Sequence, residues 1–271
     1  MEINNAVSLY FSPTGSTRRI VTEIARNLPW PSRELDVTDY SANDEVRRMT
    51  ARELLLAGVP VYGGRVPATA VRRLKNIRGG DTPAVIVAVF GNRDYADALL
   101  ELKDLLEGQG FRVAAALAAV AEHNIMRSVA GGRPDARDIE FIDNFAAKAA
   151  GKISAAVDVK ELAPVTVKGN RPYRGYGGVP FKPSADSGCV RCGLCAAKCP
   201  VRAIPEEAPN KTDDKKCVTC MRCVKICPQG ARSLNKLLLC AAEKLFDLGQ
   251  KSLRNLPPRF ARVVRPPAGA A

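Results

Sequence analysis

The sequence predicts a doubly wound, parallel α/β sheet followed by a small cysteine-rich domain. Over residues 1–158, short apolar runs alternate with amphipathic stretches of helical spacing, which is the pattern of strand–helix–strand units in a parallel sheet. Eight of the nine cysteines then fall between positions 189 and 227, and none precedes them. A length of 271 residues suits two domains of ordinary size.

The first 158 residues contain five apolar runs that predict strands. They cover residues 6–11, 33–37, 53–61, 84–90 and 111–120, and the run at 33–37 is the weakest. Helical spacing predicts helices over 16–28, 68–77, 95–107 and 135–156. Residues 159–185 are rich in Pro, Gly and Arg and are interpreted as a linker, and the tyrosines in it indicate that it packs on a neighbour.

Two segments complete the predicted organisation. Residues 186–233 hold the cysteine block, and residues 234–271 are expected to form an amphipathic helix and a basic tail. Cys240 lies on the apolar face of that helix and is expected to be a small core residue. The leucines of the helix are expected to pack on the cysteine domain, with a membrane surface as the alternative. No apolar stretch reaches the roughly 18 residues needed to span a bilayer.

The cysteine block is an internal repeat. CVRCGLCAAKCP at 189–200 returns as CVTCMRCVKICP at 217–228, and each copy reads C-x2-C-x2-C-x3-C-P. Three cysteines at this spacing hold three corners of a cubane iron–sulfur cluster, while the fourth points to a different site. One [4Fe-4S] cluster is therefore predicted on Cys189, Cys192, Cys195 and Cys227. The other is predicted on Cys217, Cys220, Cys223 and Cys199.

The alternatives for these thiols are disulfides and two zinc sites. Disulfides conflict with the reducing, cytoplasmic setting that we expect because no signal peptide is recognisable. Four-cysteine zinc sites use paired C-x2-C knuckles rather than triplets followed by Cys-Pro. Over residues 186–232 the block resembles the bacterial two-cluster ferredoxins, and this resemblance implies single-electron transfer at low potential by a small α+β domain.

The turn after the first predicted strand carries a cluster of hydroxyl groups. Ser12, Thr14, Gly15, Ser16 and Thr17 lead from that strand into the first predicted helix. Ligands of an open parallel sheet bind beyond the carboxyl ends of the strands, and a helix N-terminus with hydroxyl groups suits a phosphate. The loop is neither a Walker loop nor the G-x-G-x-x-G fingerprint. The alternative interpretation is an ordinary capped turn.

Two further loops leave the same predicted edge of the sheet. VPVYGGRVP at 59–67 and VFGNRDY at 89–95 each combine glycine, which permits close backbone approach, with a tyrosine able to stack on a flat ring. Their candidate cofactor-binding residues are Pro60, Val61, Tyr62, Gly63, Gly64, Phe90, Gly91, Asn92 and Tyr95.

Over residues 3–155 these three loops resemble those of flavodoxins, which implies a five-stranded sheet of order 2-1-3-4-5. The resemblance implies that Thr14, Gly15 and Thr17 hold the phosphate of FMN, and that the other two loops sandwich its isoalloxazine ring. Pro13 within the phosphate loop, and Tyr where Trp is common, depart from the family. The stretches PVYGGRVP, GNRDY, AEHN, GRPD and GNRPY extend the resemblance to the flavodoxin–ferredoxin fusion proteins of anaerobic bacteria and archaea, which are inferred to be redox carriers.

The main functional hypothesis is an electron carrier of anaerobic metabolism that passes single electrons between FMN and two [4Fe-4S] clusters. One alternative is a flavin-dependent reductase of a small molecule, and another is a flavin-free ferredoxin with a flavodoxin-like docking domain. A carrier is favoured over a substrate-converting enzyme because no nicotinamide fingerprint is present. His123, the only histidine, is either a proton donor at the predicted edge or a hydrogen-bonded loop residue.

The charge of the chain restricts its partners. The net charge is +13, but the basic residues are scattered and only 6% of residues are aromatic, so no stacking platform for bases is predicted and nucleic acid is not an expected partner. A basic surface suits acidic redox proteins as donor or acceptor.

Overall fold

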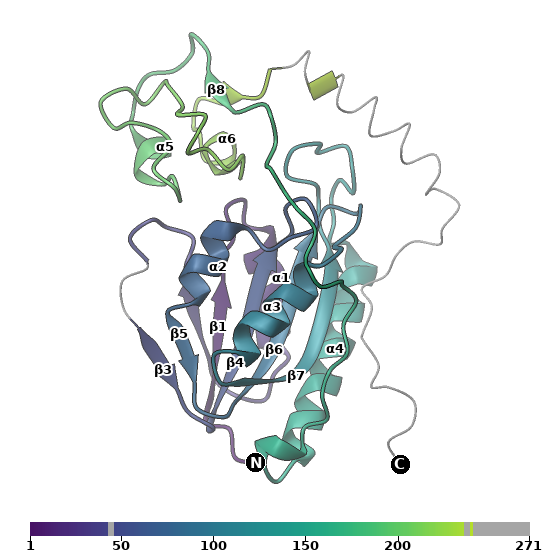
Figure 1. The fold of residues 1–271 in the computed structure, drawn as a ribbon. Coiled ribbons are helices and arrows are strands. Elements are labelled where there is room, and N and C mark those ends of the chain that lie inside the picture. The colour runs from purple at the N-terminus through teal and green to yellow at the C-terminus, as the bar shows by residue number, and fades with distance from the viewer. Residues whose placement is uncertain (43–45, 236–238, 241–271) are drawn as a thin grey trace.

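The computed structural model describes residues 1–42, 46–235 and 239–240. Its first 161 residues form an α/β domain and the cysteine block forms a second, smaller domain (Figure 1). The elements of the first domain are β1 (Asn5–Tyr10), α1 (Ser16–Arg26), β2 (Ser32–Asp36), β3 (Arg47–Met49), β4 (Glu53–Pro60), α2 (Ala68–Leu74), β5 (Ile77–Gly79), β6 (Thr82–Phe90), α3 (Ala98–Glu107), β7 (Phe111–Val120), α4 (Ala136–Ala155) and the 3-10 helix η1 (Val159–Glu161).

The main sheet has the predicted topology. Its five parallel strands lie in the order β2-β1-β4-β6-β7, which is the flavodoxin-like order 2-1-3-4-5 when only these strands are counted. The chain also forms a short parallel pair, β3 with β5, that the sequence pattern did not predict. Each is only three residues long, so neither leaves a periodic signal in the sequence.

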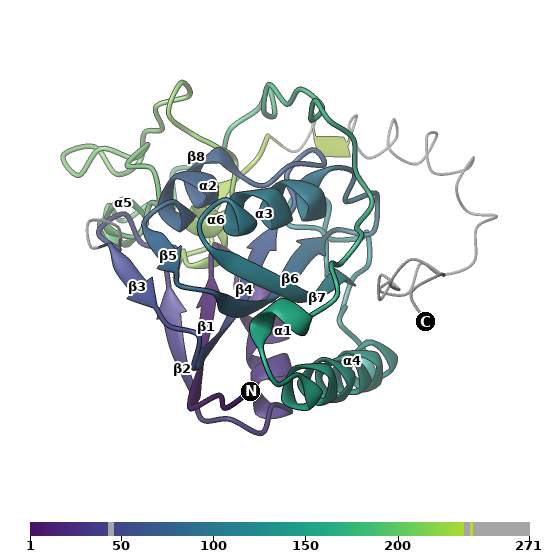
Figure 2. The same cartoon turned by 60° about the horizontal axis from the view of Figure 1, so that its bottom comes forward.

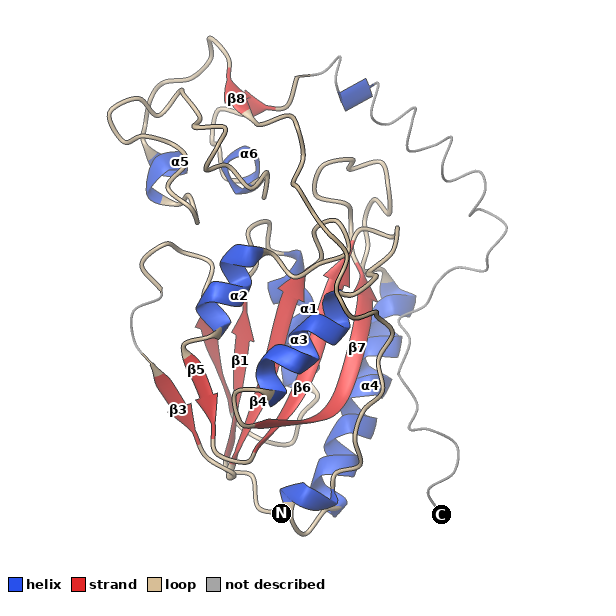
Figure 3. Cartoon of the chain, in the orientation of Figure 1, coloured by secondary structure: helices blue, strands red, loops and turns tan. Residues whose placement is uncertain are grey.

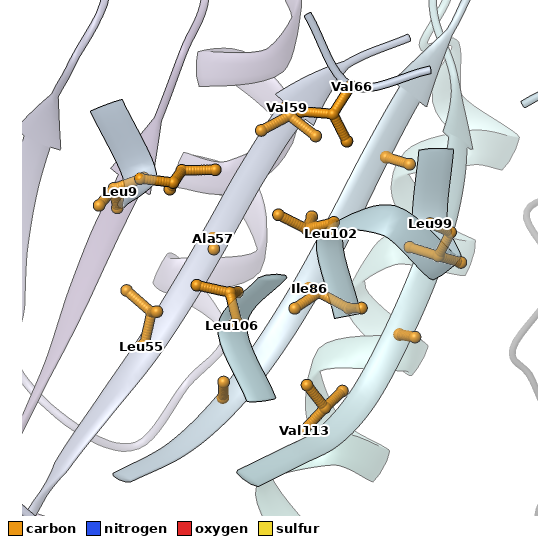
Figure 4. Packing of buried hydrophobic residues seen from close by; sticks show 14 of the residues in the cluster. Leu9, Leu55, Ala57, Val59, Val66, Ile86, Leu99, Leu102, Leu106 and Val113 are labelled. Atoms are coloured by element: carbon orange, nitrogen blue, oxygen red, sulfur yellow. The ribbon is translucent and has the colours of Figure 1, made fainter. Parts of the chain in front are cut away.

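Helices cover both faces of the sheet. Figure 2 shows α2 and α3 on one face and α1 and α4 on the other, with the strands between them. All nine residues of β6 are buried, which explains why its sequence, TPAVIVAVF, is continuously apolar rather than alternating. Figure 4 shows the core beneath α3, where Leu99, Leu102 and Leu106 pack against the strands.

The ends of the helices differ from the predicted ranges for local reasons. α2 ends at Leu74, because Ile77 already begins β5. α3 begins at Ala98 rather than residue 95, because Ala96 has a positive φ of 40°. α4 begins at Ala136 after a capping box, in which the Asp135 carboxylate accepts a hydrogen bond from the Asp138 backbone N–H.

Helix α1, which carries the predicted phosphate loop at its start, lies close against the sheet. The close approach occurs at Gly58 of β4, where an added Cβ would stand 2.2 Å from Val21 Cγ2 and 3.1 Å from Thr17 Cγ2. A side chain at position 58 would therefore push the start of α1 away from the sheet.

The second domain contains four short elements: β8 (Ser184–Ala185), α5 (Leu194–Ala197), α6 (Arg222–Lys225) and β9 (Arg232–Ser233). β8 pairs antiparallel with β9, so the two ends of the cysteine block are joined. Figure 3 shows this domain above the carboxyl ends of the sheet strands, with α2 directly below α5 and α6.

Some predictions concern the segment after the cysteine block. Most of the helix predicted within residues 234–271 lies outside the described residues, and Ser233 before it belongs to β9. Cys240 is exposed, so its prediction as a core residue is wrong. Among the described residues, no helix combines the length and the apolar character needed to cross a bilayer.

Candidate functional site

The hydroxyl-rich loop between β1 and α1 has the form of an anion-binding turn. Gly15 has a φ of 90°, and it begins α1 without any side-chain cap. The Ser12 hydroxyl accepts a hydrogen bond of 2.9 Å from the Arg18 N–H, while the Ser12 N–H donates to Thr38 Oγ1 at 2.7 Å. The first turn of an α-helix has no intrahelical partners for its N–H groups, so Ser16 and Thr17 present these groups at the loop.

The side chains of this loop do not all face one way. Thr14 and Ser16 are partly exposed, whereas Ser12 and Thr17 are buried. Thr17 Cγ2 faces Gly58 of β4. The loop is therefore held from beneath by Ser12 and Thr17 and offers Thr14, Gly15 and Ser16 outward.

The loop after β4 is covered by the linker. Gly63 and Gly64 have φ values of 58° and 84°. A Cβ on Gly63 would stand 2.1 Å from the ring of Tyr176, and one on Gly64 would stand 2.9 Å from Arg174. The pKa of Tyr62 lies well above its ordinary value, first because of burial and then because of Cys220 and Tyr176. Tyr62 thus lies where the first domain, the linker and the cysteine domain meet.

The loop after β6 packs inward. The rings of Phe90 and Tyr95 meet edge to face with centroids 5.5 Å apart, and Lys168 of the linker lies 5.4 Å from the Tyr95 ring centroid. Gly91 approaches His123 so closely that a Cβ there would be 2.6 Å from the imidazole. Asn92 has a φ of 55°, which turns the backbone before Tyr95.

His123 organises its own loop. Its Nδ1 accepts hydrogen bonds from the backbone N–H groups of Ile125 and Met126, at 3.2 and 3.1 Å. Burial, and secondly the Arg93 cation, lowers the pKa of His123 to about 4. The imidazole is consequently neutral at physiological pH, which favours the hydrogen-bonded loop residue over the proton donor.

A cavity of about 530 Å³ lies between the two domains at the carboxyl edge of the sheet. Thr14 and Ser16 of the hydroxyl-rich loop line it, together with residues of the loop after β7 and of the second cysteine motif. The described residues that line it are Thr14, Ser16, Glu122, Asn124, Ile125, Arg127, Ser128, Met221, Val224, Lys225, Ser233, Leu234 and Leu239. We call it the edge cavity. The other predicted flavin residues are not part of its lining.

The eight cysteines of the repeat surround two separate cavities. Cys189, Cys192, Cys195 and Cys227 line one of them. Cys199, Cys217, Cys220 and Cys223 line the other. The structure thus brings each fourth cysteine to the triplet of the opposite motif. Across the described residues, no three His, Cys, Asp or Glu side chains are grouped to hold a single metal ion.

The two motifs repeat their backbone conformation as well as their sequence. Arg191 and Thr219, at equivalent positions, have φ values of 53° and 52°. Gly193 and Met221 begin α5 and α6 with φ values of 77° and 64°. Met221 lines both the edge cavity and the cavity of Cys199, Cys217, Cys220 and Cys223. We therefore call the latter the proximal cavity and the other the distal cavity.

Burial governs the thiols of the proximal cavity. Burial first, and then the neighbouring cysteines, raise the pKa of Cys220 to about 12 and that of Cys223 to about 11. Without a cation beside them, Cys220 and Cys223 are protonated at neutral pH. A metal centre supplies the positive charge that stabilises four adjacent thiolates.

An acidic face of α3 fixes the linker. Asp97 accepts hydrogen bonds from the backbone N–H groups of Asn170 and Arg174, at 2.9 and 2.7 Å. Asp104 accepts from Arg171 at 2.5 and 2.8 Å and from the Tyr173 hydroxyl at 2.5 Å. Between them, Glu101 forms a bidentate pair with Arg65, with both distances 2.8 Å. This face holds the linker and the loop after β4 together.

Comparison with known families decides the nature of the second domain. Residues 183–228 match the family described as a 4Fe-4S dicluster domain. The chain thus joins a domain with the flavodoxin-like strand order to a cysteine block that matches the 4Fe-4S dicluster family. This combination indicates redox electron transfer, and the zinc and disulfide alternatives for the cysteine block are not supported. A comparison with curated proteins finds no match.

Several solved structures align with part of this chain at low identity and low TM-score. A flavodoxin from the domain Archaea is 13% identical over 55% of this chain and 99% of its own, with a TM-score of 0.38. The apo form of the NADH:FMN oxidoreductase EmoB is 13% identical over 59% and 95%, with a TM-score of 0.40. Rubredoxin oxygen:oxidoreductase from Desulfovibrio gigas is 18% identical over 57% and 38%, with a TM-score of 0.37. These values are too low to indicate an activity for this chain.

The residues at the carboxyl edge fit the phosphate end of FMN. A Cβ added at Gly15 would meet no atom within 4 Å, so the backbone of the loop is open to a ligand there. Lys225 and Arg127 add cationic groups to the edge cavity. The contacts predicted for the flavin ring are less open, because linker residues cover Gly63 and Gly64 and Tyr95 packs on Phe90.

Sequence reasoning missed the acidic face of α3. Its signal was present, since Asp97, Glu101 and Asp104 follow a helical i, i+4, i+7 spacing and the linker opposite them carries Arg171 and Arg174. It also missed the edge-cavity residues Met221 and Lys225, because no local pattern reveals that the second cysteine motif faces the phosphate loop.

The low pKa of His123 predicts the pH behaviour of the fold. A histidine whose pKa falls from its ordinary 6.5 to about 4 on folding stabilises the fold above about pH 6.5, and this contribution declines as the pH falls towards 4. We expect the single imidazole to keep its neutral-form NMR signals between pH 8 and 5. A titration midpoint near 6.5 would contradict the buried arrangement, and His123→Gln, which cannot titrate, should remove the acid-dependent loss of stability.

Proposed function

We propose that this chain is an electron carrier that passes single electrons between FMN in the first domain and two [4Fe-4S] clusters in the second. The observation that carries the proposal is the pair of four-cysteine cavities, one of which shares Met221 with the cavity at the phosphate loop. FMN exchanges one or two electrons and a [4Fe-4S] cluster exchanges one, so together they connect donors and acceptors of different electron number.

Residues of both domains have roles at the proposed flavin site. Thr14, Gly15 and Ser16 would bind the phosphate through hydroxyl and backbone N–H groups, and Lys225 would add a cation from the second domain. Met221 is 7% exposed and fills the space between the edge and proximal cavities, where it excludes water. Tyr62 interacts with Cys220, one of the proximal thiols.

The ionisable groups near the edge cavity favour a carrier over a reductase. Hydrogen bonding and charge from Arg127 lower the pKa of Glu122, so this carboxylate is ionised at neutral pH. His123 is neutral at the same pH because its pKa is about 4. Neither group is poised to transfer a proton to a substrate near neutrality, as a reductase of a small molecule would need.

Acidic redox proteins are the proposed external partners, and the distal cavity is the proposed point of exchange. Cys192 of this cavity is exposed, and Val190 and Leu194 beside it are 64% and 40% exposed. Arg191 lies between them and is also exposed. An apolar patch with a cation directly over a redox centre suits a transient contact with a partner of opposite charge.

The exchange of cysteines between the motifs can be tested by single substitutions. Cys227→Ser should remove the cluster of the distal cavity, although Cys227 belongs to the second motif, and Cys199→Ser should remove that of the proximal cavity. Iron and acid-labile sulfide per chain should fall to about half in each variant. Cys240→Ser is the matched control and should keep the full content. Loss of iron from Cys240→Ser, or none from either ligand variant, contradicts the assignment.

The flavin site is tested by FMN content. Protein purified without oxygen, supplied with FMN and freed of excess should release about one FMN per chain in acid. Thr14→Asp should weaken binding by tenfold or more, because it places a carboxylate beside the phosphate. Ser154→Asp adds the same charge to the exposed far end of α4 and should not weaken it. Absence of flavin with full iron content would leave a ferredoxin with a flavodoxin-like domain. Reduction of the clusters while bound FMN stays oxidised would exclude the relay.

Electron exchange with a small acidic ferredoxin tests the docking surface. Leu194→Asp should slow the second-order rate by on the order of tenfold, because it removes apolar contact and repels the partner. The rate of the unaltered protein should also fall as salt rises to about 0.5 M. Val157→Asp changes an 80% exposed apolar residue just after α4 and is the control. Equal slowing by the two variants would place the contact elsewhere.

A further inference from the structure

A buried arginine of the first domain holds the turn that carries one proximal cysteine. Arg73 of α2 is only 1% exposed. Its Nη1 donates hydrogen bonds to the carbonyl oxygens of Val37 and Thr38, both at 2.5 Å. Its Nη2 donates to the carbonyl oxygen of Pro200 at 2.6 Å. Pro200 directly follows Cys199. The guanidinium of the first domain is therefore hydrogen-bonded to the backbone beside a cysteine of the second domain.

The same arginine is linked to the phosphate loop. Thr38, whose carbonyl accepts from Arg73, also accepts the Ser12 N–H through Oγ1 at 2.7 Å. Phe11, the residue before Ser12, has its ring 5.5 Å from the guanidinium carbon. A continuous set of contacts therefore runs from the start of the phosphate loop through Thr38 and Arg73 to the Cys199–Pro200 turn.

Asp39, which follows Thr38 in the loop after β2, forms ion pairs with both cysteine motifs. Asp39 accepts hydrogen bonds from Lys198 at 2.8 Å and from Arg222 at 2.5 Å. Lys198 precedes Cys199, and Arg222 precedes Cys223. Tyr40 lies beneath Arg202, with the guanidinium carbon 4.1 Å from the ring centroid. The junction is thus fixed at several points, and Arg73 is its most buried member.

The partners of Arg73 leave its charge in place. All three hydrogen-bond acceptors are neutral carbonyl oxygens, and its Nε has no hydrogen-bond partner among the described residues. The carboxylates of Asp39 and Asp36 attract the guanidinium through space but form no hydrogen bond with it. An arginine needed only to join two domains would be neutralised by a carboxylate at lower desolvation cost. Here a positive charge is buried one hydrogen bond away from Pro200, which lines the proximal cavity, and charges act strongly in such a low-dielectric position.

We propose that Arg73 is a positioning residue that places the Cys199–Pro200 turn and supplies a buried positive charge which eases reduction of the proximal cluster. The proposal rests on the proposed function, since it assumes clusters on the cysteine sets. One-electron reduction adds a negative charge to a cluster, and a nearby cation stabilises the reduced form. The proximal cluster is consequently the better electron acceptor from a flavin at the phosphate loop.

The test uses the reduction potentials of the full chain, loaded with iron and sulfide without oxygen and titrated while the EPR signal of reduced clusters is followed. Arg73→Met should shift the reduction equilibrium of one cluster about tenfold towards the oxidised form, which corresponds to 59 mV for a one-electron couple. Arg73→Lys, which keeps the charge, should restore most of this shift. Arg72→Met removes an exposed charge from the adjacent position and should leave both potentials unchanged.

The single-cluster variants assign the effect. Arg73→Met should move the potential in the Cys227→Ser background, which keeps the proximal cysteine set, and leave it in the Cys199→Ser background. If Arg73→Met does not fold, Arg73→Gln is compared with Arg73→Lys. The glutamine keeps a hydrogen-bond donor and loses the charge. Unchanged potentials, equal movement of both clusters, or an equal effect of Lys and Gln would overturn the proposal. Because the clusters titrate with or without bound FMN, absence of flavin would refute the relay and leave this test intact.

Discussion

The contact between the end of the sheet and the Cys199–Pro200 turn is the constraint on which the arrangement of the two domains depends. The loop after β2 and the buried Arg73 of α2 form one side of it, and residues flanking two proximal cysteines form the other. Since parallel strands all end at this edge, a domain fixed there covers the phosphate loop and closes the edge cavity. The cavity therefore belongs to neither domain alone.

This constraint also explains the conformation of the linker. A chain leaving α4 at the far end of the sheet must return along its length to reach the carboxyl edge, as Figure 1 shows. The acidic face of α3 guides this return, because Asp97 and Asp104 bind the backbone and side chains of residues 170–174. Asp97 is buried and its pKa is lowered, first by the hydrogen bond from the Arg174 backbone, so it is ionised where it binds. The linker is consequently part of the fold.

The features that the sequence predicted correctly are those set by local spacing. Alternating strands and helices predicted a parallel, doubly wound sheet, and the resemblance of the loops to those of flavodoxins implied its strand order. The cysteine repeat predicted which thiols share a cavity. The spacing C-x2-C-x2-C-x3-C lets the first three cysteines of a motif surround one site and directs the fourth to the other site. In contrast, the sequence did not predict that the Tyr95 ring packs edge to face on Phe90, and its contact with a flavin ring stays a prediction.

Arg73 shows why the remainder was beyond a sequence pattern. It stands beside Arg72 in a short basic helix, and the two are indistinguishable by charge or periodicity, yet Arg72 is exposed and Arg73 is buried. The difference arises from Pro200, which lies 127 residues away in the chain. Contacts between domains depend on the shape and the hydrogen bonds of residues that are far apart in the sequence. Neither property leaves a pattern in a short stretch of sequence.

Two redox centres of one chain can be brought together by a flexible tether or by packing of their domains, and the two arrangements have different physical requirements. A flexible tether raises the effective concentration of one centre near another, and the distance between them fluctuates with the length of the linker. Here the linker is bound along α3 and the cysteine domain is held at Asp39 and Arg73, so packing rather than chain length sets the separation. Met221, shared by the edge and proximal cavities, then occupies a fixed position between them. The domains are joined as parts of one site, and the order of the cavities, edge, proximal and distal, follows from that junction.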